Sequence, residues 1–285
     1  MGNVKIIADS TCDLSDEQFA ENDIDMLPLS IVMGEKSYFD RSEITPEEIF
    51  RWADENKTTP KTAAISMEMA VEKARPYVEA GRDIIFFGIS EDMSTTCNVM
   101  RLAAGELGTD RIFVIDSRSL STGIGLQVLR AAEMAMEGRP AEEIVAKIEG
   151  ARDLVRASFV VDTLTYLARG GRCSSVTALL ANTLKLKPRI AVRDGKMGVD
   201  KKYRGALSKV ILKYTKDMEE ELLHAEGKRV FITHSGCDRA IVEQVRTYLE
   251  GLGVFEQVIE TRAGGVISSH CGPGTLGVLF YVRED

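Results

Sequence analysis

The sequence of 285 residues has few of the local signals that mark redox, metal or membrane proteins. Its five cysteines are scattered and form no Cys-x-x-Cys pair, so neither a disulfide framework nor a zinc site is predicted. No apolar run approaches the roughly 20 residues that cross a bilayer, and no signal-peptide pattern precedes the first predicted strand. We therefore expect a reduced cytoplasmic protein without a metal, a cofactor or an integral membrane segment.

Signatures of nucleotide and nucleic-acid binding are also missing. The sequence has no Gly-Lys-Ser/Thr phosphate loop, and no Gly-x-Gly-x-x-Gly follows its first strand. Its 36 Lys and Arg against 44 Asp and Glu give a net charge of -8, which disfavours a nucleic-acid partner. The segment Lys185 to Lys213 is the exception, with ten basic and two acidic residues. It is either a solvated face or a docking surface for an acidic or phosphate-bearing partner, and Arg204 is the residue to test.

Short apolar runs alternate with helical patterns, which indicates an α/β fold. We expect two lobes: residues 1–155 with a mostly parallel sheet flanked by helices, and residues 156–285 with a mixed sheet and helices. Strands are predicted at 4–8, 84–89, 112–115, 157–161 and 230–233. Helices are predicted after the capping residues Ser15 and Thr45, over 123–138 and over 141–155, together with one that carries Leu179, Leu180 and Leu184. Arg193-Asp194-Gly195-Lys196 predicts a type I′ hairpin.

Hydroxyl-rich stretches follow several strands, at the sheet edge where ligands bind in open α/β folds. Asp9–Leu14 is interpreted as turn and capping chemistry. Ser94-Thr95-Thr96 lies between a strand and a helix, where free N–H groups and the helix dipole suit an anion, although it is equally an ordinary N-cap. Thr62 lies in a predicted loop, 59–66, and Ser66 is expected to cap the next helix.

A glycine-rich stretch, 264–277, carries His270 ahead of a Gly-Pro-Gly turn. Its glycines allow the backbone to approach a ligand closely, and the stretch is expected to be a loop that leads into a strand at 278–282. His224 and His234 have no comparable setting, so we assign them structural roles.

These motifs, in this order, resemble the DegV family of bacterial fatty-acid-binding proteins, and the similarity covers about 3–283. Thr62 stands where the family has Thr-Ser-Gln-Pro, and Ser94 stands where it has Ser-Gly-Thr. The remaining matches are Asp9–Leu14, Thr163–Leu167, Gly170-Gly171-Arg172, Leu186-Lys187-Pro188 and His270–Gly274.

The resemblance implies two α/β lobes and a long-chain fatty acid, such as palmitate or oleate, bound non-covalently in the first lobe. It implies that Thr62 and Ser94 hold the carboxylate, with His270, Arg172, Thr95 and Thr96 as neighbours. It also implies a carrier in lipid transport or fatty acid metabolism, not an enzyme. The carrier would present the carboxylate to a partner fatty acid kinase.

Two other functions stay open from the residues alone. Ser94 and His270 could serve as nucleophile and base of a hydrolase or acyltransferase, although no Gly-x-Ser-x-Gly motif surrounds Ser94. A nucleotide or sugar-phosphate binder is the third possibility, and only the fold class suggests it.

Overall fold

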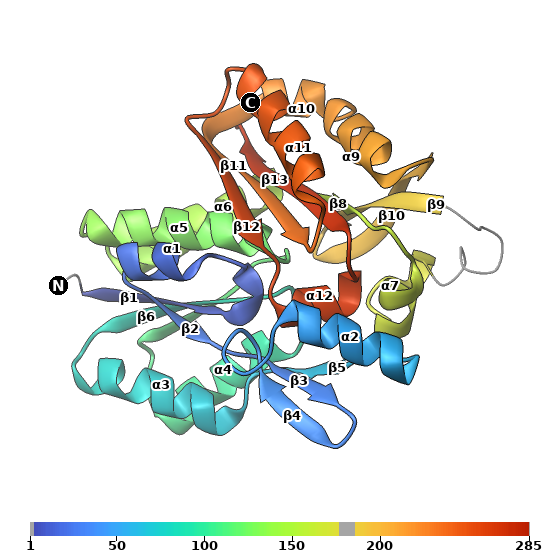
Figure 1. Ribbon diagram of the computed structural model, residues 1–285. Coiled ribbons are helices and arrows are strands. Elements are labelled where there is room, and N and C mark those ends of the chain that lie inside the picture. Colours follow the sequence, from blue (N-terminus) through green and yellow to red (C-terminus); the bar gives the residue numbers. More distant parts are fainter. Residues whose placement is uncertain (1–2, 177–185, 285) are drawn as a thin grey trace.

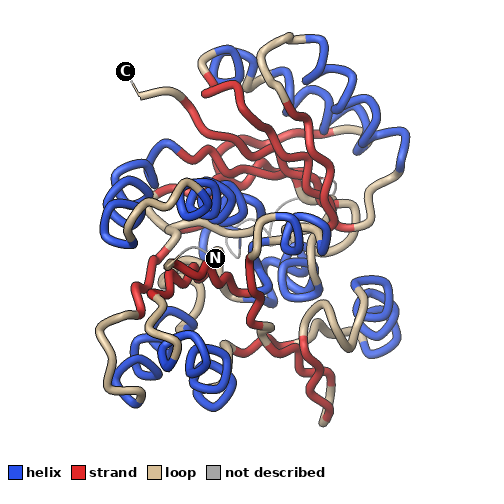
Figure 2. The backbone as a smooth tube through the Cα atoms, turned by 90° about the vertical axis from the view of Figure 1, so that its left-hand side faces the viewer, coloured by secondary structure: helices blue, strands red, loops and turns tan. Residues whose placement is uncertain are grey.

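The computed structural model describes residues 3–176 and 186–284 of the chain (Figure 1). Two large sheets dominate it, and a layer of helices lies between them (Figure 2). This arrangement confirms the predicted α/β class with one parallel and one mixed sheet. The predicted helix with Leu179, Leu180 and Leu184 falls outside the described residues.

The first large sheet is parallel, with strand order β2-β1-β6-β7. Every residue of β1 is buried, including Lys5, as its mostly apolar sequence predicts for a strand covered on both faces. Ser15 and Thr45 both form the predicted capping boxes, at α1 and α2. The elements are β1 (Val4–Asp9), the 3-10 helix η1 (Ser10–Cys12), α1 (Asp16–Glu21), β2 (Ile24–Leu27), α2 (Pro46–Asn56), α3 (Met67–Glu79), β6 (Asp83–Gly88), α4 (Thr96–Glu106), β7 (Ile112–Asp116), α5 (Thr122–Met136) and α6 (Ala141–Ala151).

A small antiparallel sheet, β4-β3-β5, lies beside the parallel one and corrects the prediction for residues 59–66. Lys61–Ala63 forms the strand β5, where the sequence predicted a loop. With three residues, this strand is too short to show an alternation of apolar and polar residues in the sequence. Its antiparallel pairing with β3 (Ser30–Met33) holds it in the extended conformation. Ile31 stands opposite Thr62, while β4 (Lys36–Phe39) pairs with the other edge of β3.

The second large sheet is mixed, with strand order β10-β9-β8-β13-β11-β12, and only β11 and β12 run parallel. The predicted hairpin joins β9 to β10, and positive φ angles of 49° at Asp194 and 78° at Gly195 fit a type I′ turn. The elements are the 3-10 helix η2 (Arg152–Leu154), β8 (Val155–Val160), α7 (Thr165–Gly170), β9 (Leu186–Arg193), β10 (Lys196–Arg204), α9 (Leu207–Lys216), α10 (Glu219–Leu223), β11 (Ala225–Ser235), α11 (Arg239–Gly251), β12 (Gln257–Arg262), α12 (Gly265–Cys271) and β13 (Thr275–Val282).

The glycine-rich stretch at 264–277 is not a loop throughout, because Gly265–Cys271 forms the helix α12. Two glycines open this helix, so its intrinsic propensity is low. Carboxylates from the first lobe bind its N-terminal N–H groups and stabilise it there. Although α12 follows β12 in the chain, it packs against α2, β3 and β5 (Figure 1).

The core joins the two lobes. Helix α5 is buried around most of its circumference and contacts β1, β6, β8 and β13, so it lies between the two sheets. One hydrophobic cluster contains Ile6 and Phe87 from the first sheet together with Phe159 and Leu279 from the second. The second sheet begins at Val155, and the lobe boundary there stays a prediction.

None of the described helices is long and apolar enough to cross a membrane. Within residues 3–176 and 186–284, no group of three or more His, Cys, Asp or Glu side chains could hold a metal ion.

Candidate functional site

A cavity of about 530 Å³ lies at the junction of the lobes, within the size range of small-molecule sites. It brings together Thr62, Ser94, Thr95, Arg172 and His270, which come from four separate parts of the chain. Its other lining residues are Leu29, Ala63, Ala64, Ile89, Glu91, Asp92, Met93, Leu120, Met197, Val266, Ile267 and Cys271. One wall of the cavity is therefore polar, and most of the remainder is apolar.

The polar wall centres on a hydrogen bond between Thr62 and His270. Thr62 Oγ1 lies 2.8 Å from His270 Nε2, although the two residues are 208 positions apart in the sequence. β5 carries Thr62 and the last turn of α12 carries His270. A Cβ on Gly170 of α7 would lie 2.3 Å from His270 Nδ1, so the imidazole fits only because residue 170 is glycine.

Two buried carboxylates hold the helix that carries His270. Asp13 accepts a hydrogen bond from Gly264 N at 2.8 Å, and Asp40 accepts one from Gly265 N at 2.7 Å. Burial raises the pKa of Asp13 to about 7 and also raises the pKa of Asp40. Asp13 belongs to the stretch interpreted as capping chemistry, and it caps a helix more than 250 residues away in the chain. The stretch therefore positions His270 without touching the cavity.

His270 is neutral at pH 7. Burial and the positive charge of Arg172 lower the pKa of its imidazole to about 4. Its Nδ1 has no hydrogen-bond partner among the described residues, so only Nε2 is engaged. If Nε2 carries the proton, it donates to Thr62 Oγ1 and leaves the Thr62 hydroxyl proton free for a ligand in the cavity.

Ser94 and its neighbours form a second polar position at the start of α4. Ser94 Oγ lies 2.9 Å from Thr96 Oγ1 and accepts a weaker hydrogen bond from Thr96 N at 3.3 Å. Thr95 is the N-cap residue and makes no side-chain capping bond, so it is free to face the cavity that it lines. Thr96 is buried and does not line the cavity. The hydrogen bond with the Thr96 hydroxyl therefore helps to fix the position of the Ser94 side chain.

Arg172 supplies the cationic group of the site. Its Nη1 donates to Gly170 O at 2.7 Å, which anchors the guanidinium at the end of α7. Sequence reasoning did not identify Glu91 and Asp92, which line the same cavity. Asp92 pairs with Lys196 at 3.6 Å, and Glu91 pairs with Arg101. Each acid thus has a basic partner, while Arg172 has no carboxylate within 4.0 Å among the described residues.

The apolar lining was also missed. Val266, Ile267, His270 and Cys271 all line the cavity, with the i, i+1, i+4, i+5 spacing of one helical face. This helical spacing is visible in the sequence, but the glycines on either side of it led to the prediction of a loop. A narrower apolar cavity, whose lining also includes Leu120, Ile267 and Cys271, lies next to this one.

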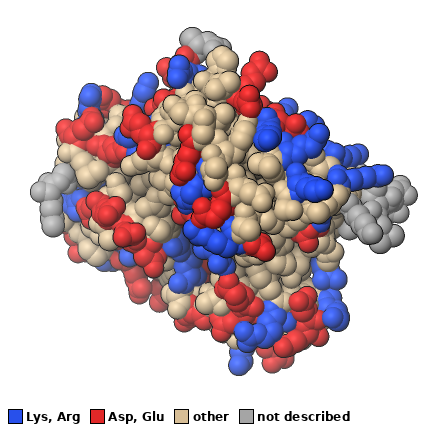
Figure 3. Space-filling model, turned by 45° about the horizontal axis from the view of Figure 1, so that its top comes forward, with Lys and Arg blue, Asp and Glu red and all other residues tan. Residues whose placement is uncertain are grey.

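Arg204 lies outside the cavity. It is exposed at the end of β10. Lys and Arg side chains gather on one side of the molecule (Figure 3). Several basic residues of this segment pair with acids: Lys187 with Asp162, Arg193 with Asp200 and Lys201 with Asp217. The segment is thus partly neutralised, and no carboxylate of the described residues pairs with Arg204.

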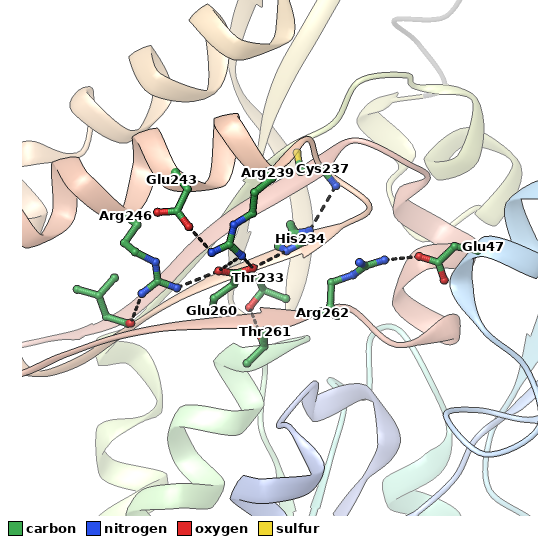
Figure 4. A network of polar contacts seen from close by, with 11 residues as sticks. Glu47, Thr233, His234, Cys237, Arg239, Glu243, Arg246, Glu260, Thr261 and Arg262 are labelled. Atoms are coloured by element: carbon green, nitrogen blue, oxygen red, sulfur yellow. Dashed lines mark hydrogen bonds and ion pairs between the residues drawn. The ribbon is translucent and has the colours of Figure 1, made fainter.

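The other two histidines lie away from the cavity, in agreement with the structural roles assigned to them. His234 is buried and lies 3.3 Å from Glu260, which also binds Arg239 and Arg246 (Figure 4). In the same network Arg262 of β12 reaches Glu47 of α2 and so links the two lobes. His224 bonds to Glu220 O at the end of α10.

Known proteins resemble the chain over its whole length. The DegV family model matches residues 3–283. A DegV domain-containing protein of Clostridium perfringens is 34% identical, with 100% of both chains covered. A fatty-acid-binding DegV family protein of Thermus thermophilus has a structure with a TM-score of 0.91 at 31% identity, covering 99% of this chain and 100% of that one.

A stearic-acid-binding protein of Eubacterium ventriosum has a TM-score of 0.85 at 27% identity, with 98% of each chain covered. The two solved structures share the fold of this chain, and all the matches extend over both lobes. The chain belongs to the DegV family.

Proposed function

We propose that this protein binds a long-chain fatty acid, such as palmitate or oleate, non-covalently in the cavity at the lobe junction. The Thr62–His270 hydrogen bond carries the proposal, because it joins two residues of the predicted headgroup site across 208 positions of sequence. The fatty-acid-binding relatives from Thermus thermophilus and Eubacterium ventriosum support the ligand class.

The apolar part of the cavity suits the acyl chain. Each methylene removed from water contributes about 0.8 kcal/mol, so a chain of about 16 carbons offers on the order of 10 kcal/mol before ordering costs. Leu29, Ile89 and Ile267 provide branched apolar surface, and Met93 and Met197 provide unbranched side chains that adapt to a flexible ligand. The free energy of binding then resides mainly in the acyl chain.

The polar wall suits the carboxylate. A carboxylate taken out of water is costly unless donors receive it. The hydroxyls of Thr62 and Ser94 supply such donors, the charge of Arg172 favours the ionised form, and Thr95 is a neighbour. His270 remains neutral and orients the Thr62 hydroxyl, so it is a positioning residue in this scheme.

The same geometry favours a carrier over a serine hydrolase. Ser94 Oγ is bonded to Thr96, and His270 Nε2 is bonded to Thr62. No Ser94–His270 hydrogen bond exists among the described residues, and no acid orients the free Nδ1. We propose that the bound carboxylate is presented to a partner fatty acid kinase in the cytoplasm, for use in lipid transport or fatty acid metabolism.

Lipid content tests the headgroup assignment. Thr62→Ala combined with Ser94→Ala removes two donors, and the co-purified fatty acid measured by native mass spectrometry should fall at least tenfold. Thr58→Ala with Ser42→Ala is the matched control, since both side chains are exposed. A full lipid load in the first double variant, with folding intact by circular dichroism, would show that the carboxylate is held elsewhere.

Docking to a kinase is tested separately at Arg204. Arg204→Glu reverses an exposed charge on the basic face, and we expect slower transfer of phosphate from ATP to the bound fatty acid by a fatty acid kinase, with unchanged lipid content. Arg75→Glu on α3 is the control, because it reverses an exposed charge elsewhere. Equal rates of phosphate transfer in the Arg204→Glu and Arg75→Glu variants would show that Arg204 does not take part in docking.

A further inference from the structure

A second cavity of about 480 Å³ lies between the lobes and shares no lining residue with the proposed lipid site. Its walls come from the loop after β7, from η2 and from strands β8 and β9. Five arginines line it: Arg118, Arg152, Arg156, Arg189 and Arg193. Such a concentration of one residue type in one cavity is unexpected in a chain with a net charge of -8.

Among the residues that line this cavity, the five arginines outnumber the acids, which are Asp153, Asp194 and Glu221. Each arginine also lies within 4.0 Å of a carboxylate, because Glu149 pairs with Arg152 and Asp200 is shared by Arg189 and Arg193. Arg118 and Arg193 each donate a hydrogen bond to a carboxylate. Arg156 lies 3.8 Å from Glu221, which is beyond hydrogen-bond distance.

One guanidinium nitrogen within this set is buried and unpaired. Arg152 Nε has no hydrogen-bond partner among the described residues, whereas Arg189 Nε lies 3.3 Å from Asp200, which Arg193 also binds. A buried donor without an acceptor costs about 1–3 kcal/mol, and more when the group is charged. Arg152 is fixed through its Nη1, which donates to Asp116 O at 2.9 Å, so it cannot turn away freely. An acceptor-rich anion in the cavity would satisfy this donor.

We propose that this arginine cavity binds the phosphoryl group of a small molecule. A phosphoryl group has three terminal oxygens and a charge near -2, and guanidinium groups bind such oxygens in paired hydrogen bonds. A carboxylate has two oxygens and could engage fewer of the five arginines. The cavity volume exceeds what an inorganic phosphate fills, so it also accommodates an organic phosphate of modest size.

The arginine cavity adjoins the proposed lipid site through two shared segments. Ser119 lines the arginine cavity, and the next residue, Leu120, lines the lipid cavity. Arg193 and Asp194 of the β9–β10 hairpin line the first cavity, and Met197 lines the second. Ser90 Oγ donates to Gly195 O at 2.7 Å and holds the hairpin tip on the first lobe. The phosphoryl proposal does not depend on the lipid proposal, since no lining residue is common to both.

Calorimetric titration tests the arginine cavity with three probes at matched ionic strength: inorganic phosphate, ribose 5-phosphate and acetate. We expect phosphate or ribose 5-phosphate to bind the wild-type protein, and acetate to bind at least tenfold more weakly. Tighter binding of ribose 5-phosphate indicates an organic phosphate ligand, whereas tighter binding of inorganic phosphate indicates the free anion. Equal binding of acetate, or no binding of either phosphate, would refute the phosphoryl assignment.

Arginine variants locate the binding event. Arg189→Met should weaken phosphate binding at least tenfold, and Arg156→Met, at a side chain 40% exposed, should do the same without a threat to folding. Arg51→Met, exposed on α2, removes the same charge outside the cavity and should change nothing. If the Arg189→Met variant does not fold, the phosphate affinity of the Arg156→Met variant alone tests the proposal. Phosphate binding by Arg156→Met as tight as by Arg51→Met would overturn the proposal.

Discussion

At the scale of single residues, His270 shows how surroundings decide the chemistry of a side chain. An exposed histidine changes charge near pH 6.5, but burial and the guanidinium of Arg172 lower the pKa of His270 to about 4. A neutral imidazole at pH 7 fixes a hydroxyl by one hydrogen bond and does not compensate a carboxylate charge. The compensating charge at this site belongs to Arg172.

The first prediction at this scale concerns the protonation of His270. Its folded-state pKa lies below the unfolded value of 6.5, so the folded protein resists protonation, and His270 destabilises the fold as pH falls from 6.5 towards 4. Above pH 6.5 it contributes no pH dependence. In a proton NMR titration, the imidazole signal that disappears in His270→Asn should show no inflection between pH 5.5 and 8. An inflection near 6.5 would contradict the buried neutral state.

At the scale of elements, α12 connects the distant parts of the site. This helix has seven residues, too few for stability on its own, so tertiary contacts must hold it. Asp13 and Asp40 bind its first N–H groups, while Thr62 of β5 bonds to His270 in its last turn. Gly170 of α7 packs directly against the imidazole. The position of His270 therefore depends on four residues from four separate segments of the chain.

The packing of α7 on α12 gives the second prediction. Gly170→Ala places a Cβ 2.3 Å from His270 Nδ1, and the rigid ring must move, which breaks its bond to Thr62. Fatty acid affinity should fall about tenfold, as measured by displacement of a fluorescent lipid.

The control for this variant is Gly150→Ala on α6, where a Cβ has open space. That substitution should stabilise the protein by about 0.5–1 kcal/mol and leave lipid affinity unchanged. Wild-type affinity in Gly170→Ala would show that the His270 position is not set by α7.

At the scale of the whole molecule, the two sheets share a core. Helix α5 contacts strands of both sheets, and one cluster of buried side chains includes Phe87 on one side and Phe159 on the other. Separating the lobes would expose this surface at about 25 cal/mol per Å² of apolar area. The lobes are therefore one unit in energetic terms, despite their separate sheets.

Cooperative unfolding is the prediction at this scale. Trp52 on α2 is the only tryptophan, so its fluorescence reports on the surroundings of α2, whereas far-ultraviolet circular dichroism reports on the helices and strands of both lobes. Because the core is shared, the two thermal transitions should coincide. Two transitions separated by several degrees would indicate lobes that unfold independently and would contradict the role of α5.

The sequence by itself determined the local features of this protein. The strand β1, the capping boxes at Ser15 and Thr45 and the Asp194-Gly195 turn each depend on adjacent residues, so they were predictable. The order of the motifs indicated the family. Thr62, Ser94, Arg172 and His270 were named from that resemblance, and the cavity brings them together.

Only the tertiary structure decided how distant segments meet. Lys61–Ala63 is a strand because β3 pairs with it, and Gly265–Cys271 is a helix because Asp13 and Asp40 cap it. The lowered pKa of His270 and the grouping of five arginines in one cavity likewise depend on residues far apart in sequence. The physical reason is the same throughout: burial and pairing partners are properties of the folded chain, and local propensity does not contain them.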